Sequence, residues 1–179
     1  MKLRKKNLNI LKKNHIYDDS MEHDSCGVGL VASTEGLKSR KVVEQGIQAL
    51  KAVWHRGAID ADGKTGDGAG IHIEIPKDFF IERIENAGRR HDDGIICVGM
   101  IFLPKNDYGA QEKCKTIVEN ELLKRNYYIY RWRQVPVNTR VLGVKAEANR
   151  PEIVQIIFKS NNKNLKNDDL ERDLFVARK

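Results

Sequence analysis

The sequence predicts an α+β domain, because β-prone runs and amphipathic helical stripes occur along the same chain. A near-continuous apolar run at residues 94–104, GIICVGMIFLP, is typical of a buried strand. Apolar residues at helical spacing follow it from Asp107, and another apolar run lies at 153–158. A chain of 179 residues is long enough to bury a sizeable core without disulfides or metals.

The first expected elements are a strand and a helix. Residues 26–33, CGVGLVAS, form a short β-prone run that contains glycine and predicts a buried strand. Residues 39–56 predict a helix with Ser39 as its N-cap. Its apolar stripe has the spacing i, i+4, i+7 and i+11, at Val43, Ile47, Leu50 and Trp54.

A glycine-rich loop at residues 55–70, HRGAIDADGKTGDGAG, follows this helix. Ile71, Ile73 and Ile75 then alternate with polar residues, which predicts a strand at 69–76. A short helix is expected within 77–88, ahead of the apolar strand described above.

The second half of the chain continues the mixed pattern. The helix from Asp107 should bury one face, made of Ala110, Cys114, Ile117, Val118 and Leu122. Strands are expected at 127–135, around 141–144 and at 153–158, and the first of these should place Tyr128, Tyr130 and Trp132 on one side. After a polar linker at 160–169, the last segment predicts a helix capped by Asp168 or Asp169.

Composition excludes several classes of protein. The chain carries 32 Lys plus Arg and 25 Asp plus Glu, but no apolar stretch long enough to span a membrane and no signal-peptide pattern, so we expect a cytoplasmic protein. Cys26, Cys97 and Cys114 are far apart and form no zinc-type or disulfide pattern, so we expect no metal.

The sequence does not support a phosphate-binding loop, a calcium loop or a nucleic-acid stacking platform. The GKT string at Gly63 lacks the spacing and the preceding strand of a phosphate-binding loop. A calcium loop starting at Asp60 would have Lys64 at its fifth position, which leaves too few oxygen ligands. Arg131 and Arg133 alternate with aromatic residues as in a nucleic-acid stacking platform, but a half-buried strand predicts the same alternation, so nucleic acid is not expected as a partner.

Cys26 is the strongest candidate nucleophile, since it stands at the mouth of a predicted strand and is followed by Gly27. If the chain were cut before Cys26, one residue would carry both a thiol and a free α-amine. The amine, with a pKa of about 7.7 to 8.0, could accept the thiol proton near neutral pH. A buried structural cysteine is the alternative interpretation.

Four segments together carry a family resemblance: HDSCGVGLVAS, HRGAIDADGKTGDGAGIHIEIPKDFF, RPEIVQIIF and ERDLFVARK. In this order and spacing they closely resemble the N-terminal glutaminase domain of glutamate synthase large subunits. That domain is a class II glutamine amidotransferase of the N-terminal-nucleophile hydrolase superfamily. The resemblance runs from about Met21 to Lys179.

The resemblance implies an αββα sandwich, incomplete at the C-terminus of this chain. It implies that residues 1–25 are a propeptide and that 26–179 are the N-terminal part of the amidotransferase domain. Cys26 would be the nucleophile and, after cleavage, its α-amine the base. Arg56 would support the site electrostatically, or would instead cap the preceding helix. Asp67, Gly68 and Gly70 match a family loop near this site, where the glycines are expected to serve the turn.

The resemblance also implies partners beyond this chain. Glutamine would be the substrate, and its ammonia would convert 2-oxoglutarate to glutamate in the remaining synthase domains. FMN, an iron–sulfur cluster and electrons from NAD(P)H or ferredoxin would serve there, and a small electron-transfer subunit could join. The residues that hold glutamine are expected beyond Lys179. Two alternatives stay open: an inactive truncated remnant that acts as an interaction or nucleic-acid-binding module, and an amidotransferase with another ammonia acceptor.

Overall fold

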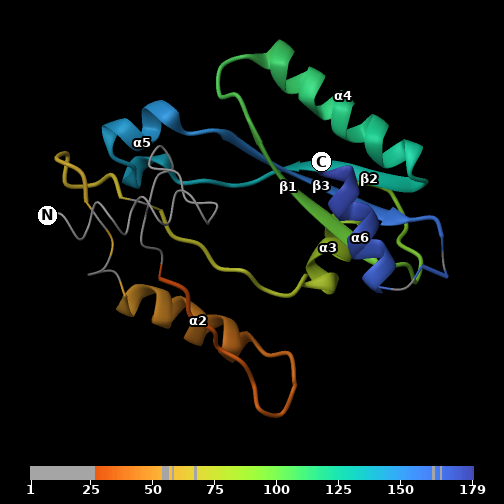
Figure 1. Ribbon diagram of the computed structural model, residues 1–179, viewed down its shortest axis with the longest axis horizontal. Helices are drawn as coiled ribbons and strands as arrows, with labels where there is room; N and C mark the ends of the chain where they lie inside the picture. Colours follow the sequence, from red (N-terminus) through yellow and green to blue (C-terminus); the bar gives the residue numbers. More distant parts are fainter. Residues whose placement is uncertain (1–26, 54–56, 58, 67, 163, 166) are drawn as a thin grey trace, which may run out of the picture. The chain divides into compact units, whose positions relative to one another are not determined.

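The computed structural model describes residues 27–179 except 54–56, 58, 67, 163 and 166 (Figure 1). The chain divides into two compact units, Met1–Arg56 and Gly57–Lys179, and each is described by itself. The second unit mixes helices with an antiparallel sheet, which confirms the α+β expectation.

The first unit contains helix α2, Arg40–Ala52. Its N-cap is Ser39, whose hydroxyl accepts a hydrogen bond from the Val42 amide at 3.4 Å, as the sequence predicts. Val43 and Ile47 on its apolar stripe are half-buried. Trp54, the last member of that predicted stripe, lies outside the described residues.

The strand predicted at 26–33 is wrong over its described part. Residues 27–33 form no strand, and Val28 and Leu30 are 96% and 91% exposed. A strand needs a neighbour for its backbone N–H and C=O groups, and among the described residues none pairs with this segment. The apolar sequence alone therefore does not produce the element.

The second unit is built on three antiparallel strands in the order β1-β3-β2 (Figure 1). These strands are β1 (Ile96–Leu103), β2 (Tyr127–Gln134) and β3 (Glu152–Ser160), all close to their predicted positions. Strand β3 is central, and its run of apolar residues fits a strand that is covered on both faces.

Helices α4 (Tyr108–Lys124) and α6 (Asn167–Ala177) supply side chains to one face of the sheet. The core there joins Leu122 and Leu170 of these helices to residues of all three strands, namely Cys97, Tyr127, Ile156 and Phe158. Asp107 caps α4 by accepting a hydrogen bond from the Ala110 amide at 2.9 Å, so the helix begins one residue after the Asp107 predicted as its start. Both helices confirm the sequence expectation.

Helix α3 (Lys77–Glu85) packs on the opposite face. Phe80 and Ile84 form a second core cluster with Ile96, Tyr130 and Ile157. This helix was predicted within 77–88, and Gly88 in the turn that follows it has a positive φ of 72°. Helices therefore pack against part of each face of the sheet.

The predicted common face of Tyr128, Tyr130 and Trp132 is wrong for Trp132. A register shift between Ile129 and Arg131 leaves an extra residue in β2. One extra residue reverses the faces of all the residues that follow it. Trp132 consequently packs in the α4 and α6 cluster, while Tyr130 packs beneath α3.

Two further strand predictions are wrong. Residues 71–76 form no strand, and Ile71 and Ile73 remain exposed. The strand expected around 141–144 is instead a 3-10 turn at Thr139–Val141 followed by helix α5, Val144–Asn149. Good helix formers in the sequence KAEA favour the helix there.

The predicted inner face of α4 needs one correction. Ile117 is 55% exposed because it lies about 100° around the helix from Val118, which packs against the core. Gln111 is buried instead, and its amide donates to the Pro104 carbonyl at 2.6 Å.

At the C-terminus, Asp168 and Asp169 lie in the first turn of α6, because the helix already begins at Asn167. None of the helices in the described ranges is long and apolar enough to cross a membrane.

Candidate functional site

The glycine-rich loop after Arg56 forms a short hairpin in the second unit. Ile59 and Gly66 pair across it as an isolated antiparallel bridge. The Asp60 amide donates to the Thr65 carbonyl at 2.8 Å, and the Gly63 amide donates to the Asp60 carbonyl at 2.9 Å. Gly63 has a φ of 68°, a conformation that glycine adopts without strain. The loop thus has a defined turn rather than the phosphate-loop geometry excluded by its sequence.

Asp62 organises the tip of this hairpin. Its carboxylate accepts hydrogen bonds from the Lys64 amide at 2.9 Å, the Thr65 amide at 2.7 Å and the Thr65 hydroxyl at 2.5 Å. The Thr65 hydroxyl, followed by these amides, holds the pKa of Asp62 well below its usual range. The carboxylate therefore stays ionised throughout the neutral pH range and keeps accepting these bonds.

Helix α5 lies beside the hairpin (Figure 1) and binds it through two hydrogen bonds. The Lys145 ammonium donates to Asp60 Oδ2 at 2.6 Å, and the Ala146 amide donates to the Thr65 hydroxyl at 3.4 Å. Gly143 precedes the helix, and a Cβ there would lie less than 3.0 Å from Asp62 Oδ2 and from Thr65 Oγ1. The hairpin tip and the start of α5 therefore fit closely together.

An ion-pair network connects α5 to the sheet. The Lys105 ammonium, just after β1, donates to Glu147 Oε1 at 2.5 Å and to the Glu147 carbonyl at 3.0 Å. Arg150 pairs with Glu147 at 3.2 Å and with Glu152 of β3 at 3.5 Å. Lys105 and Arg150 together lower the pKa of Glu147. The hairpin is thus linked through α5 to two strands.

The predicted catalytic residues, Cys26 and Arg56, lie outside the described residues, as does Asp67. The hairpin nevertheless lies directly between Arg56 and Asp67 in the chain. Gly68, next to Asp67, has a φ of 91°, a conformation that glycine adopts without strain.

Sequence reasoning missed the residues that hold the hairpin, namely Asp62, Thr65, Gly143 and Lys145. The aspartate and threonine, three positions apart in a glycine-rich turn, are a recognisable signal for side-chain-to-backbone hydrogen bonding. No such signal marks Gly143 or Lys145, since Lys145 is 85 residues from Asp60, its partner.

Cys97 is unsuited to nucleophilic chemistry. It is buried in the core under α4 and α6, and burial, with a smaller contribution from Glu171, raises the pKa of its thiol to about 12. At pH 8 only about one thiol in 10⁴ would be ionised at such a pKa. Of the two described cysteines, Cys114 is the more accessible.

We therefore expect iodoacetamide at pH 8 to alkylate Cys114 while Cys97 stays unmodified until the protein unfolds. Peptide mass spectrometry of the native and the urea-treated protein measures both sites. Alkylation of Cys97 in the native protein at the rate of Cys114 would contradict the burial described here.

The geometry does not favour a nucleic-acid platform on β2. The Arg131 guanidinium donates to the Arg83 carbonyl at 3.0 Å. The Arg133 guanidinium donates to Gln155 Oε1 at 2.7 Å and lies 5.2 Å from the centre of the Phe79 ring. Both cations are half-buried and bound within the molecule, so they are not presented for phosphate contacts.

Comparisons with a family profile and with individual known proteins indicate the same family. The sequence profile of the class-II glutamine amidotransferases matches residues 26–179. The chain is 53% identical over 163 residues to the glutamate synthase (NADPH) large chain of Azospirillum brasilense, covering 91% of this chain and 11% of that protein. It is 39% identical over 159 residues to the ferredoxin-dependent glutamate synthase of Pyropia yezoensis, covering 88% of this chain and 10% of that protein.

The chain thus spans about a tenth of the length of the curated relatives that it matches. A similar match is found in the glutamate synthase (NADPH) large chain of Bacillus subtilis, at 31% identity over 94% of this chain. The family resemblance stated from HDSCGVG, HRGA and TGDGAGI is confirmed. The chain belongs to the class-II glutamine amidotransferases.

Proposed function

We propose that this chain supplies the glutaminase portion of a glutamate synthase, with Cys26 as its nucleophile. The observation that carries the proposal is the family match, which begins at residue 26 and continues to residue 179. Similarity to proteins named glutamate synthase, both NADPH- and ferredoxin-dependent, supports the synthase assignment over another ammonia acceptor. Residues 1–25 would be a propeptide whose removal exposes the Cys26 amine.

In the proposed reaction the Cys26 thiolate attacks the side-chain amide carbon of glutamine. The thiol proton passes to the Cys26 α-amine and then to the departing nitrogen, so the C–N bond breaks and ammonia leaves. The product is a γ-glutamyl thioester. Water then attacks this thioester with the same amine as base, which releases glutamate and restores the thiol.

Arg56 would act electrostatically beside Cys26. A fixed guanidinium there stabilises negative charge on the carbonyl oxygen as the tetrahedral intermediate forms. The hairpin at 59–66 begins three residues after Arg56 in the sequence.

The ammonia would aminate 2-oxoglutarate in the remaining domains of the synthase. Reduction there needs FMN and an iron–sulfur cluster, fed by NADPH or ferredoxin, the donors for which the relatives are named. Among the described residues no group of three or more His, Cys, Asp and Glu side chains gathers. We assign both groups to the rest of the synthase.

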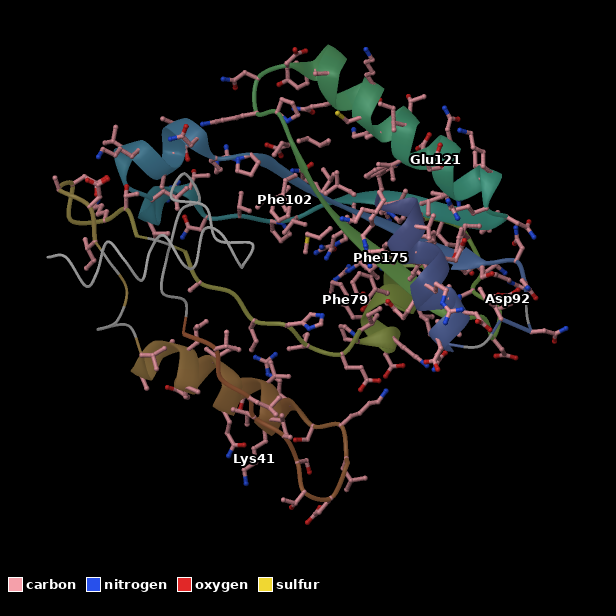
Figure 2. The ribbon with its side chains drawn as sticks, viewed as in Figure 1. Lys41, Phe79, Asp92, Phe102, Glu121 and Phe175 are labelled. Carbon is pink, nitrogen blue, oxygen red and sulfur yellow. The ribbon has the colours of Figure 1, made fainter. Side chains whose placement is uncertain are left out.

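We further propose that the sheet is one layer of an αββα sandwich. Met100 and Phe102 lie on the same face of β1 as Ile96, but they are 49% and 63% exposed. Figure 2 labels Phe102. Helix α3 covers Ile96 on that face. An apolar sheet face of this kind is suited to packing against a second sheet.

Glutamine labelled with ¹⁵N at its amide tests the proposal in the complete protein. With 2-oxoglutarate and an electron donor, we expect the label in the α-amino group of newly formed glutamate. Unlabelled glutamate formed from 2-oxoglutarate, with the label only in free ammonium, would contradict the coupling to synthesis. The inactive-remnant alternative predicts neither product.

A further inference from the structure

A small cavity lies at one end of the sheet in the second unit, where β2 begins and β3 ends. Its volume is about 360 Å³, near the lower end of the range typical of small-molecule sites. The turn before β1 and the two strands line it, with Arg90, His91, Asp92, Tyr128, Tyr130 and Lys159 among the lining residues. Tyr130 also belongs to the core beneath α3, so the cavity lies on that face of the sheet.

Lys159 brings a positive charge to the inner part of the cavity. Its side chain is 15% exposed, and its ammonium pairs with the carboxylate of Asp92, which is labelled in Figure 2. The ammonium also lies 5.7 Å from the centre of the Tyr128 ring and 6.0 Å from that of Tyr130. Asp92 satisfies one of the three N–H donors of the ammonium. Lys159 therefore keeps the capacity to bind a second oxygen acceptor.

Two arginines add positive charge at the outer edge of the cavity. The Arg89 guanidinium donates to the Ile129 carbonyl at 2.7 Å and lies 5.9 Å from the centre of the Tyr128 ring, so it is fixed in place. Arg90 is exposed, and no hydrogen bond or ion pair ties its side chain to another described residue. Asp92 is the one carboxylate among the described lining residues, so the cations outnumber it.

The aromatic wall of the cavity carries neutral hydrogen-bonding groups. The Tyr130 hydroxyl is 2.9 Å from His91 Nδ1, and the two rings meet edge to face. Burial, with a smaller contribution from Asp92, raises the pKa of Tyr130 to about 12. The hydroxyl therefore stays neutral near pH 7 and adds no negative charge that would repel an anion.

We propose that this cavity binds a small oxyanion, the carboxylate or phosphate group of a metabolite, between Lys159 and Arg90. The ammonium of Lys159 is partly shielded from water, so it attracts a negative charge more strongly than it would in bulk solvent. A guanidinium such as that of Arg90 pairs with two oxygens of a carboxylate or phosphate at once. Asp92 would compete with the bound anion for Lys159. The inference goes beyond glutamine hydrolysis and does not depend on it.

The test is a titration of the full chain, labelled with ¹⁵N and followed by ¹H–¹⁵N NMR. The probes are inorganic phosphate and succinate, with sodium chloride holding the ionic strength constant and succinamide as the uncharged control. We expect saturable shifts of the amides of residues 90–92 and 159–161 with at least one anion and none with succinamide. Saturation with phosphate alone assigns a phosphate group to the site, and saturation with succinate alone assigns a carboxylate.

Three variants test the residues assigned to the site. Arg90→Gln and Lys159→Met each remove a charge at nearly constant length, and each should weaken binding about tenfold, as loss of a charged hydrogen bond usually does. Asp92→Asn removes the competing carboxylate. It should tighten binding about fivefold, the effect of one unit charge about 4 Å away in water.

Matched controls are found on the helices. Lys115 of α4 is half-buried and pairs with Glu112 at 2.7 Å, much as Lys159 pairs with Asp92. Arg172 of α6 is exposed like Arg90. Lys115→Met and Arg172→Gln make the same chemical changes at positions that do not line the cavity, so both should bind the anion as the wild type does.

Shifts that do not saturate, or that succinamide reproduces, would overturn the inference. So would saturable binding that is weakened neither by Arg90→Gln nor by Lys159→Met, or that the control variants weaken equally. If Lys159→Met fails to fold, the exposed positions still decide: tighter binding by Asp92→Asn together with weaker binding by Arg90→Gln is the expected pattern, and unchanged affinity in both contradicts it.

Discussion

Replacing Cys26 with alanine should abolish glutamine-dependent glutamate formation. The substitution removes the only atom proposed to form the thioester, and loss of a catalytic nucleophile typically lowers kcat by roughly 10⁴- to 10⁶-fold. The assay is glutamate formation from glutamine and 2-oxoglutarate by the complete protein.

Ammonium salts provide the internal control for this variant. The synthase site would still receive ammonia from solution, so Cys26→Ala should form glutamate from ammonium and 2-oxoglutarate at the wild-type rate. Undiminished glutamine-dependent formation would refute the role of Cys26. Cys97→Ala is a useful second comparison, since Cys97 is buried in the core and has no proposed part in the reaction.

Truncating the centre of the sheet should have the largest effect on stability. Ile157 lies on the central strand β3 and is 0% exposed, packed with Phe80 and Ile84 of α3. Ile157→Ala removes buried methyl groups and leaves a cavity, so we expect a loss of about 3 to 4 kcal/mol in the free energy of unfolding. Urea titration of the chain, followed by tryptophan fluorescence, measures this loss.

Ile117→Ala is the matched control, because it makes the same change on the exposed side of α4. It should cost less than about 0.5 kcal/mol, as surface substitutions in helices usually do. Ile157→Val, expected to cost about 1 kcal/mol, keeps the comparison measurable if the alanine variant fails to fold. Equal costs for Ile117→Ala and Ile157→Ala would contradict the described core.

The elements that sequence reasoning found correctly are those whose pattern is complete within one segment. The strands β1 and β3 and helices α2, α4 and α6 each carry an apolar run or stripe long enough to define its own period. Ser39 was identified as a cap because an N-cap bond is local, reaching only three residues along the chain.

The errors arise where a distant partner decides the structure. Residues 27–33 and 71–76 have strand-like sequences, but no neighbouring strand among the described residues completes their hydrogen bonds. Trp132 lies on the opposite face of β2 from the predicted one because of a bulge, and the alternation of apolar and polar residues in the sequence does not reveal that bulge. Such features depend on register, which a single segment does not encode.

The candidate site divides in the same way. Cys26 was proposed as the nucleophile from the residues around it, and Arg56 was proposed as a supporting residue from the family resemblance. Both assignments remain proposals. The contacts between the hairpin and the start of α5 were missed because the two segments are about 80 residues apart, and glycine at 143 matters only for the space it leaves. Contacts of this kind become visible only in the folded chain.

The central claim is that cleavage before Cys26 unites nucleophile and base on one residue. Intact mass and N-terminal sequencing of the protein purified from its native cells test this most directly. We predict an N-terminus at Cys26, with the α-amine free. An active protein that still begins at Met1 would contradict the claim, because its Cys26 nitrogen would be locked in a peptide bond and unable to accept the thiol proton.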